Sequence, residues 1–333
     1  MKDFPVTPYV LKRPYESRKS FVAPGLARIV LCAVSLCTAV TAAADGEQSA
    51  AENWDRGGVV YAMTNAASGN QILVYVRDAT GRLRHLPGAT ASTHGAGGSV
   101  TAAVDPLGSQ GSLVYDETSQ MLFAVNAGDN TVTAFDTGAV GFPLRVQARV
   151  ASGGFIPVSL AVSGNILYVL NAGGTGSVTT FTIGNDGTLS QAASLDLGLP
   201  PSATAPPFDQ IAAPGQVGVD ALARHLIVTH AGGQEMLVVS LDDDGVPSGP
   251  IVSTHTPGAG TFSFGVTRYG TLLVAEAASA SVSAFDPPSG TQPLVPTASA
   301  IGTGQSATCW IVVHEDGYAY VANTGSNTLS RYR

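Results

Sequence analysis

Two residues in this sequence stand where chemistry could take place. His230 and Glu276 each end a short apolar run that is followed by a turn and a second apolar run. A histidine and a carboxylate at one site can act as base and acid, or one can orient the other. At the corresponding places elsewhere, the chain has asparagine: Asn65, Asn126, Asn171 and Asn323. We therefore predict that His230 and Glu276 are catalytic. The alternative is that they replace the hydrogen bond of the asparagine or line a pore without chemistry.

The asparagines have a structural explanation of their own. An asparagine before a Gly-containing turn can bond its own backbone and tolerates left-handed conformations. As part of the same arc of positions, Asn126, Asn171 and Asn323 are also candidate substrate-binding residues.

Three further residues are candidates for holding a substrate. Gln110 and Gln216 begin apolar runs that precede two of the hairpins, and we expect them to bind a ligand rather than to catalyse. Arg268 is the cation best placed to hold a carboxylate or to stabilise an oxyanion, although the Tyr269-Gly270 turn that follows can direct it to the opposite side.

The sequence predicts no metal or organic cofactor. Its histidines lack the spacing of metal ligands, and Asp242-Asp243-Asp244-Gly245 lacks the remaining ligands of a calcium loop. An arc of asparagine carbonyls with one glutamate could hold Ca²⁺, and this stays open as an alternative.

The elements that position these residues are copies of one hairpin. Examples are LFAVNAGDNTVTAF at 122, ILYVLNAGGTGSVTTF at 166 and AYVANTGSNTLSRY at 319. The six residues that end the first run are separated by 61, 45, 59, 46 and 47 residues. A repeat of this length is typical of propellers and solenoids.

The flanks of each hairpin complete a four-stranded unit. An apolar run precedes the hairpin, as in PVSLAV at 157–162, and a more polar extended stretch follows it, as in LRVQARVASGG at 144–154. Four short strands in about 46 residues form one blade of a β-propeller. A β-sandwich would not require such hairpins at this spacing. We therefore predict an all-β propeller of four-stranded antiparallel blades with about six repeats.

A propeller brings the candidate residues to one face. The start of each inner strand and the end of each second strand point to the same mouth of the central channel. We therefore expect the six hairpin positions to form an arc around that mouth.

Several stretches resemble a known family. Tyr-Val-x-Asn followed by a Gly/Ser turn and Thr-Val-x-x-Phe resembles the YVTN-type propeller repeat. DPLGSQGSLVYD (105–116) and SATCWIVVHEDGYAYVANTGSNTLS (306–330) resemble the bacterial β-propeller lactonase-like family, which is also described as 3-carboxymuconate cyclase-like. The resemblance covers residues 57–333 and implies seven blades, so the last part of the ring is expected to be missing from this chain.

The resemblance also implies a function. We expect a lactonase-like hydrolase or a cycloisomerase that opens or forms a small lactone ring at the channel mouth, with a lactone or a small carboxylate as its ligand. The alternative is a non-catalytic propeller that serves as a binding scaffold in the cell envelope or outside the cell. An incomplete ring predicts self-association or a partner that completes it, because open sheet edges are prone to aggregation.

The first 44 residues differ from the rest of the chain. A segment rich in Lys and Arg, an apolar run at 29–40 and the Ala42-Ala43-Ala44 exit predict a cleavable secretory signal. We expect a flexible linker at 45–56, a propeller domain at 57–333, no membrane anchor after cleavage, and a periplasmic or extracellular location.

Charge excludes one class of partner. From residue 45 onward the chain has 10 Arg, no Lys and 22 Asp or Glu, a net charge of −12. Such a surface repels phosphate backbones, so we expect no nucleic-acid partner.

Overall fold

The computed structural model describes residues 10–11, 58–98 and 107–333. These residues form β-strands and connecting loops, with a single 3₁₀ turn, η1 (Pro87–Ala89). Within the described segments, no helix has the length and apolar character of a membrane span.

The strands form six antiparallel sheets in which the strand order follows the chain. The first sheet consists of β1 (Val10–Leu11), β2 (Val59–Met63), β3 (Gln71–Arg77) and β4 (Leu83–His85), with β5 (Ala91–Ser92) also pairing with β3. The second consists of β6 (Leu113–Asp116), β7 (Met121–Asn126), β8 (Thr131–Asp136) and β9 (Arg145–Ala151). The third consists of β10 (Pro157–Ser163), β11 (Ile166–Asn171), β12 (Ser177–Ile183) and β13 (Leu189–Asp196).

The remaining three sheets repeat the plan. The fourth consists of β14 (Pro214–Val219), β15 (His225–His230), β16 (Glu235–Leu241) and β17 (Pro247–His255). The fifth consists of β18 (Thr261–Val266), β19 (Leu272–Glu276), β20 (Ser281–Phe285) and β21 (Pro296–Gly302). The sixth has three strands among the described residues: β22 (Thr308–Val313), β23 (Ala319–Asn323) and β24 (Thr328–Tyr332).

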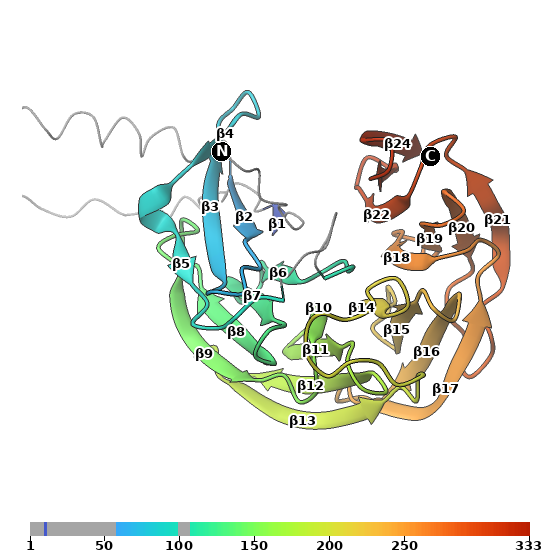
Figure 1. Cartoon of the computed structure of the whole chain (residues 1–333), viewed down its shortest axis with the longest axis horizontal. Coiled ribbons are helices and arrows are strands. Elements are labelled where there is room, and N and C mark those ends of the chain that lie inside the picture. The colour runs from blue at the N-terminus through green and yellow to red at the C-terminus, as the bar shows by residue number, and fades with distance from the viewer. Residues whose placement is uncertain (1–9, 12–57, 99–106) are drawn as a thin grey trace, which may run out of the picture.

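The six sheets lie side by side in an arc, with their first strands toward the centre and β9, β13, β17 and β21 on the periphery (Figure 1). This confirms the predicted all-β propeller of about six repeats. The first and sixth sheets face each other across a gap in the arc (Figure 1). Self-association, or a partner that covers this gap, stays a prediction.

The predicted leader and linker lie almost wholly outside the described residues, so both stay predictions. Within the leader, only Val10 and Leu11 are described, as β1 paired with Tyr61 and Val60 of β2. The first unit therefore has a short innermost strand, which the sequence immediately before Val59 did not indicate.

The arc has two faces, the mouth face and the opposite face. The mouth face carries the turns that follow the second strand of a sheet: 127–130, 172–176, 231–234, 277–280 and 324–327. The opposite face carries the turns between first and second strands, among them 220–224, 267–271 and 314–318.

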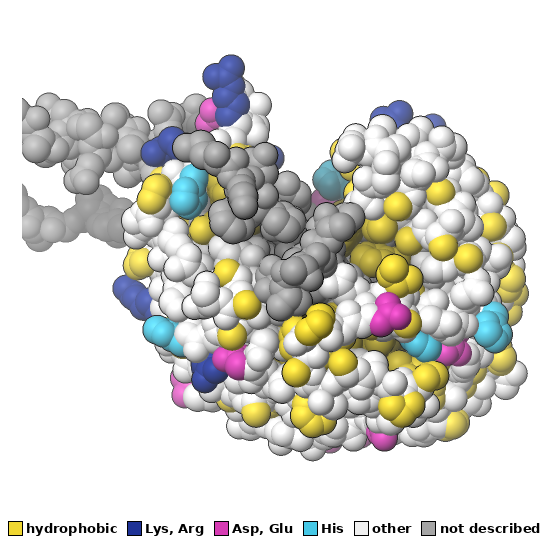
Figure 2. Space-filling model, in the orientation of Figure 1, with side chains coloured by type: hydrophobic (Ala, Val, Ile, Leu, Met, Phe, Trp, Pro, Cys, Tyr) yellow, Lys and Arg dark blue, Asp and Glu magenta, His cyan; other side chains and the backbone are white. Residues whose placement is uncertain are grey.

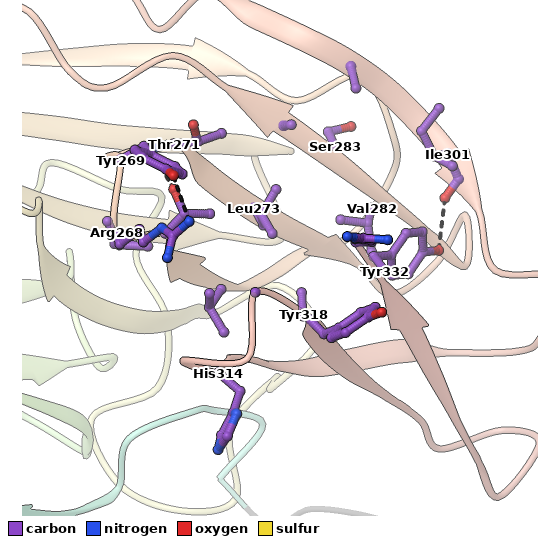
Figure 3. A pocket seen from close by; sticks show the side chains of 18 of the residues that line it. Arg268, Tyr269, Thr271, Leu273, Val282, Ser283, Ile301, His314, Tyr318 and Tyr332 are labelled. Atoms are coloured by element: carbon purple, nitrogen blue, oxygen red, sulfur yellow. Dashed lines mark hydrogen bonds between the residues drawn. The ribbon is translucent and has the colours of Figure 1, made fainter.

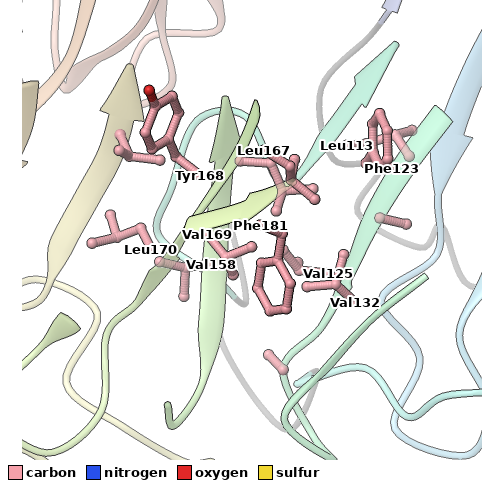
Figure 4. Close-up of a cluster of buried hydrophobic side chains, with 14 of the residues drawn as sticks. Leu113, Phe123, Val125, Val132, Val158, Leu167, Tyr168, Val169, Leu170 and Phe181 are labelled. Carbon is pink, nitrogen blue, oxygen red and sulfur yellow. The ribbon is translucent and has the colours of Figure 1, made fainter. Parts of the chain in front are cut away.

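The core lies between successive sheets. All six residues of β7, β11 and β15 are buried, because alternate side chains point to opposite faces of the sheet and a neighbouring sheet covers each face. Figure 4 shows this for β11: Leu167 and Val169 lie toward the second sheet, whereas Tyr168 and Leu170 lie toward the fourth. Continuous apolar runs in the sequence therefore mark the second strand of each unit.

A tyrosine links a sheet to the next one in two places. The hydroxyl of Tyr61 donates to the carbonyl of Gly141, at 2.7 Å, and that of Tyr168 donates to the carbonyl of Gly245, at 2.6 Å. Each acceptor lies in the connection between the third and fourth strands of the following sheet. Burial, with a smaller contribution from the charge of Asp242, raises the pKa of Tyr168 to about 12. Burial raises the pKa of Tyr61 as well, so both phenols stay protonated and act as donors.

Glutamine side chains pair the inner edges of two sheets. Gln216 accepts from the backbone N–H of Phe264 at 2.7 Å and donates to its carbonyl at 3.1 Å. Gln110 does the same to Ile311, at 3.0 and 3.1 Å, from the other side of the axis. An inner strand has no further strand beside it, and these amides take the place of one.

This pairing predicts a stability effect. Gln110→Ala leaves the N–H and carbonyl of Ile311 without the amide, which we expect to cost about 1–3 kcal/mol of unfolding free energy. Urea denaturation measures it. Gln147→Ala, at an exposed position of β9, is the matched control and should change the free energy by less than about 0.5 kcal/mol. Equal stability of the two variants would contradict the assignment.

Candidate active site

The residue at the end of the second strand reaches across its hairpin in several sheets. Asn126 Nδ2 donates to the hydroxyls of Thr131 and Thr133, both at 3.0 Å. Asn323 Nδ2 donates to Thr328 at 3.2 Å and to Ser330 at 2.9 Å. The acceptors follow the asparagine by five and seven residues. These asparagines, like Asn171, are buried within the hairpin.

Glu276 occupies the same corner with the direction of the bonds reversed. The hydroxyls of Ser281 and Ser283 donate to its carboxylate at 2.6 and 2.7 Å, and the backbone N–H of Gly258 donates at 2.8 Å. The side chain is fully buried. A carboxylate only accepts, and three donors already occupy this one. The geometry is that of a hydrogen-bonded replacement for asparagine.

His230 is held differently. Its Nδ1 lies 2.8 Å from Oε1 of Glu235, the residue directly opposite on β16. Because an ionised carboxylate only accepts, Nδ1 carries the hydrogen. The hydroxyl of Ser253, on β17, donates to the other oxygen of Glu235. This chain of contacts across β15, β16 and β17 fixes the imidazole, and none of the described residues forms a hydrogen bond with Nε2.

The charge state of Glu235 follows from these contacts. Burial acts to raise its pKa, but the hydrogen bonds from Ser253 and His230 and the charges of His230 and His255 outweigh burial. The pKa of Glu235 therefore lies below its usual value, and at neutral pH the histidine faces a carboxylate.

In three sheets a glycine before the first strand closes over the strand-end residue, whereas His230 is closed over by Gly233 of the turn that follows it. Gly95, Gly154 and Gly258 lie so close to Asn126, Asn171 and Glu276 that a Cβ at any of them would collide with that side chain. These glycines precede the first strand of their sheet. In the fourth sheet the preceding connection is the long segment 197–213, which has no glycine after 198. His230 is 5% exposed, against 0% for Glu276.

The other predicted site residues lie away from His230. Gln110 and Gln216 bond backbone groups at the axis. Arg268 lies in the turn 267–271 on the opposite face, at the far end of β18 from Thr261, which pairs with Glu276. No hydrogen bond or ion pair joins His230 to Glu276 among the described residues. The structure thus brings His230 together with Glu235 rather than with Glu276 or Arg268.

Sequence reasoning missed Glu235 and Ser253. Glu235 follows His230 by five residues, the same spacing that separates Asn126 from Thr131 and Glu276 from Ser281. That repeated spacing could have identified Glu235. Ser253 lies in an outer strand whose register is shifted by a bulge between Val238 and Ser240, so its position could not be counted from the sequence.

A groove lies between the fifth and sixth sheets, with a volume of about 890 Å³. Figure 3 shows Leu273 and Val282 along it and Arg268 at one end, where the guanidinium donates to the hydroxyl of Tyr269 at 2.6 Å. The groove opens toward the opposite face and does not include His230. Across the described segments, no three His, Cys, Asp or Glu side chains converge as metal ligands would, and the calcium alternative stays a prediction.

Comparison with known proteins agrees with this fold. The sequence model of a family described as "Lactonase, 7-bladed beta-propeller" matches residues 92–333. No curated protein matches the chain in sequence.

Solved structures share the architecture at low sequence identity. A protein from Lactobacillus plantarum superposes with a TM-score of 0.62 at 14% identity, over 82% of this chain and 77% of that one. A putative 6-phosphogluconolactonase from Bacteroides fragilis gives 0.56 at 17%, over 78% and 76%. The periplasmic gluconolactonase of Pseudomonas aeruginosa gives 0.56 at 16%, over 82% and 83%. At such identities the likeness extends to the fold alone.

The bonds of Glu276 predict a structural effect. Glu276→Ala leaves three buried donors without an acceptor, which we expect to cost about 2–4 kcal/mol of unfolding free energy. Glu276→Gln should lose less, because it keeps one acceptor and the serine hydroxyls can rotate. Asp243→Ala, in an exposed turn, is the control in urea denaturation. A Glu276→Ala variant as stable as Asp243→Ala would contradict the structural role.

The lowered pKa of Glu235 predicts a pH dependence. A carboxyl group with a lower pKa in the folded state stabilises the protein above its unfolded pKa, and loses that contribution as the pH falls through the folded value. The difference in Tm between wild type and Glu235→Gln should therefore be present at pH 6–7 and shrink below about pH 4. Calorimetry at several pH values measures it, and a difference independent of pH would contradict the assignment.

Proposed function

Since the chain belongs to the family of seven-bladed β-propeller lactonases, we propose that it hydrolyses a small lactone with His230 as the general base. The observation that carries this proposal is the pair formed by His230 and Glu235, with Nδ1 bonded to the carboxylate at 2.8 Å. A histidine whose Nδ1–H is held by a carboxylate presents Nε2 in the tautomer that can accept a proton.

The reaction is a general-base hydrolysis. Nε2 of His230 takes a proton from a water molecule while the water oxygen bonds to the lactone carbonyl carbon. The tetrahedral intermediate collapses, the ring C–O bond breaks, and the leaving oxygen takes the proton from the imidazolium. The product is an open-chain hydroxy acid. Glu235 stabilises the imidazolium formed between the two steps, and Ser253 holds Glu235 in place.

Glu276 and Arg268 have other roles in this proposal. Glu276 accepts three hydrogen bonds, two of which join β19 to β20, and its role is structural. The cyclisation of a dicarboxylate is less well supported, because the arginine that would hold a carboxylate, Arg268, belongs to the opposite face.

A second function is favoured by a separate observation. Gln110 and Gln216 bond backbone groups near the axis, and Glu276 has no free oxygen. These features suit a non-catalytic scaffold that binds a partner on one face. The predicted leader supports the further proposal that the protein acts in the periplasm or outside the cell.

Lactone hydrolysis is tested by the acid released from γ-butyrolactone and δ-valerolactone at constant pH. We expect His230→Gln to lower kcat/KM at least about 100-fold, the usual contribution of a general base. Glu235→Gln should lower it by a smaller factor and change the pH profile, because the imidazole loses its carboxylate. Glu276→Gln should retain activity once it is folded.

The control is His314→Gln, an exposed histidine on the opposite face, which should leave kcat/KM unchanged. If wild type and His230→Gln are equally inert toward the lactones, the scaffold function is favoured instead.

A further inference from the structure

No Lys or Arg side chain lies in the described segments around His230, where the other basic side chain is His255, opposite Glu235 on β17. Six segments form the mouth face of the third to fifth sheets, and none contains Lys or Arg: 152–156, 172–176, 197–213, 231–234, 256–260 and 277–280. The arginines of this part of the chain, Arg224 and Arg268, lie in turns on the opposite face. Figure 2 shows acidic and histidine side chains over β15 and β16, with the Lys and Arg side chains nearer the first two sheets and the last.

The charge that does lie beside His230 is negative. Glu235 is in direct contact with the imidazole, and Asp209 lies in the 197–213 segment, where it accepts the N–H groups of Ile211 and Ala212. A negatively charged ligand at Nε2 would therefore meet a carboxylate with no Lys or Arg to offset it, and like charges repel strongly when partly buried.

The segment 197–213 also places apolar side chains on the mouth face beside His230. Ala212 packs against Gly232 in the turn that follows His230, and the adjacent Ile211 is 85% exposed. Phe155, 48% exposed, lies against Gly173 on the same face, next to Ala203 of the segment. A hydrocarbon group on a ligand would remove this surface from water, which favours binding in proportion to the area covered.

From these observations we infer that the site selects an uncharged lactone with a hydrocarbon substituent and discriminates against anionic lactones such as phosphorylated sugar lactones. The inference rests on the proposed function and names its substrate class. The attacking water would lie at Nε2 of His230 with the ring carbonyl beside it, and the substituent would extend over Ile211.

The test compares one series of substrates with the full-length protein. The series runs from γ-valerolactone to γ-nonalactone, with glucono-δ-lactone and 6-phosphoglucono-δ-lactone as the polar and anionic members. We expect kcat/KM to rise about twofold per added methylene, because binding would remove about half of the surface of each methylene from water. The phosphorylated lactone should be at least about tenfold poorer than its unphosphorylated counterpart.

Two variants compare an exposed apolar side chain of the mouth face with one of the opposite face. Ile211→Ser should flatten the dependence of kcat/KM on chain length. Leu222→Ser, which removes a 71% exposed side chain on the opposite face, should leave that dependence unchanged.

The outcomes distinguish this inference from the proposed function. If hydrolysis depends on His230 but the phosphorylated lactone is the better substrate, or chain length has no effect, the substrate class is overturned while the lactonase function stands. If no lactone in the series is hydrolysed in a His230-dependent manner, the lactonase function itself is overturned, and the inference with it.

Discussion

The arrangement of the sheets depends on how the inner strands satisfy their backbone near the axis. Each first strand has a second strand on one side only, and its other N–H and carbonyl groups lie where no further strand fits. An unpaired buried backbone group costs as much as a lost hydrogen bond. Gln216 supplies both missing partners to Phe264, and Gln110 supplies both to Ile311. The two amides therefore fix the spacing of the second, fourth, fifth and sixth sheets at the centre.

The corner at the mouth face shows how one geometry accommodates different chemistry. A side chain at the end of the second strand meets the third strand five residues later, and asparagine, glutamate and histidine all fit there. Asparagine donates to hydroxyls, and Glu276 accepts from them. His230 instead meets a carboxylate, and the glycine that lies against it is Gly233 of the following turn rather than one that precedes the first strand. The architecture is thus retained while one corner gains a titratable pair.

Much of this could be predicted from the sequence, because the repeat is local. Hairpins at intervals of about 46 residues predicted the sheets, and the break in the asparagine pattern singled out His230 and Glu276. The contacts that distinguish these two residues are partly local as well, since Ser281 and Glu235 follow at five residues. The role of Gln110 could not be predicted, because its partner Ile311 is 201 residues away and their meeting depends on the curvature of the whole arc. The expectation that Gln110 and Gln216 bind a ligand stays a prediction.

The tyrosine links between sheets have a consequence for how the chain unfolds. Tyr61 and Tyr168 each bond a turn in the following sheet, so separating one sheet from its neighbour breaks a buried polar bond as well as an apolar contact. In arrays of repeated units, the strength of coupling between neighbours decides whether units melt singly or together. Here the coupling from the first to the second sheet and from the third to the fourth is reinforced by these two bonds.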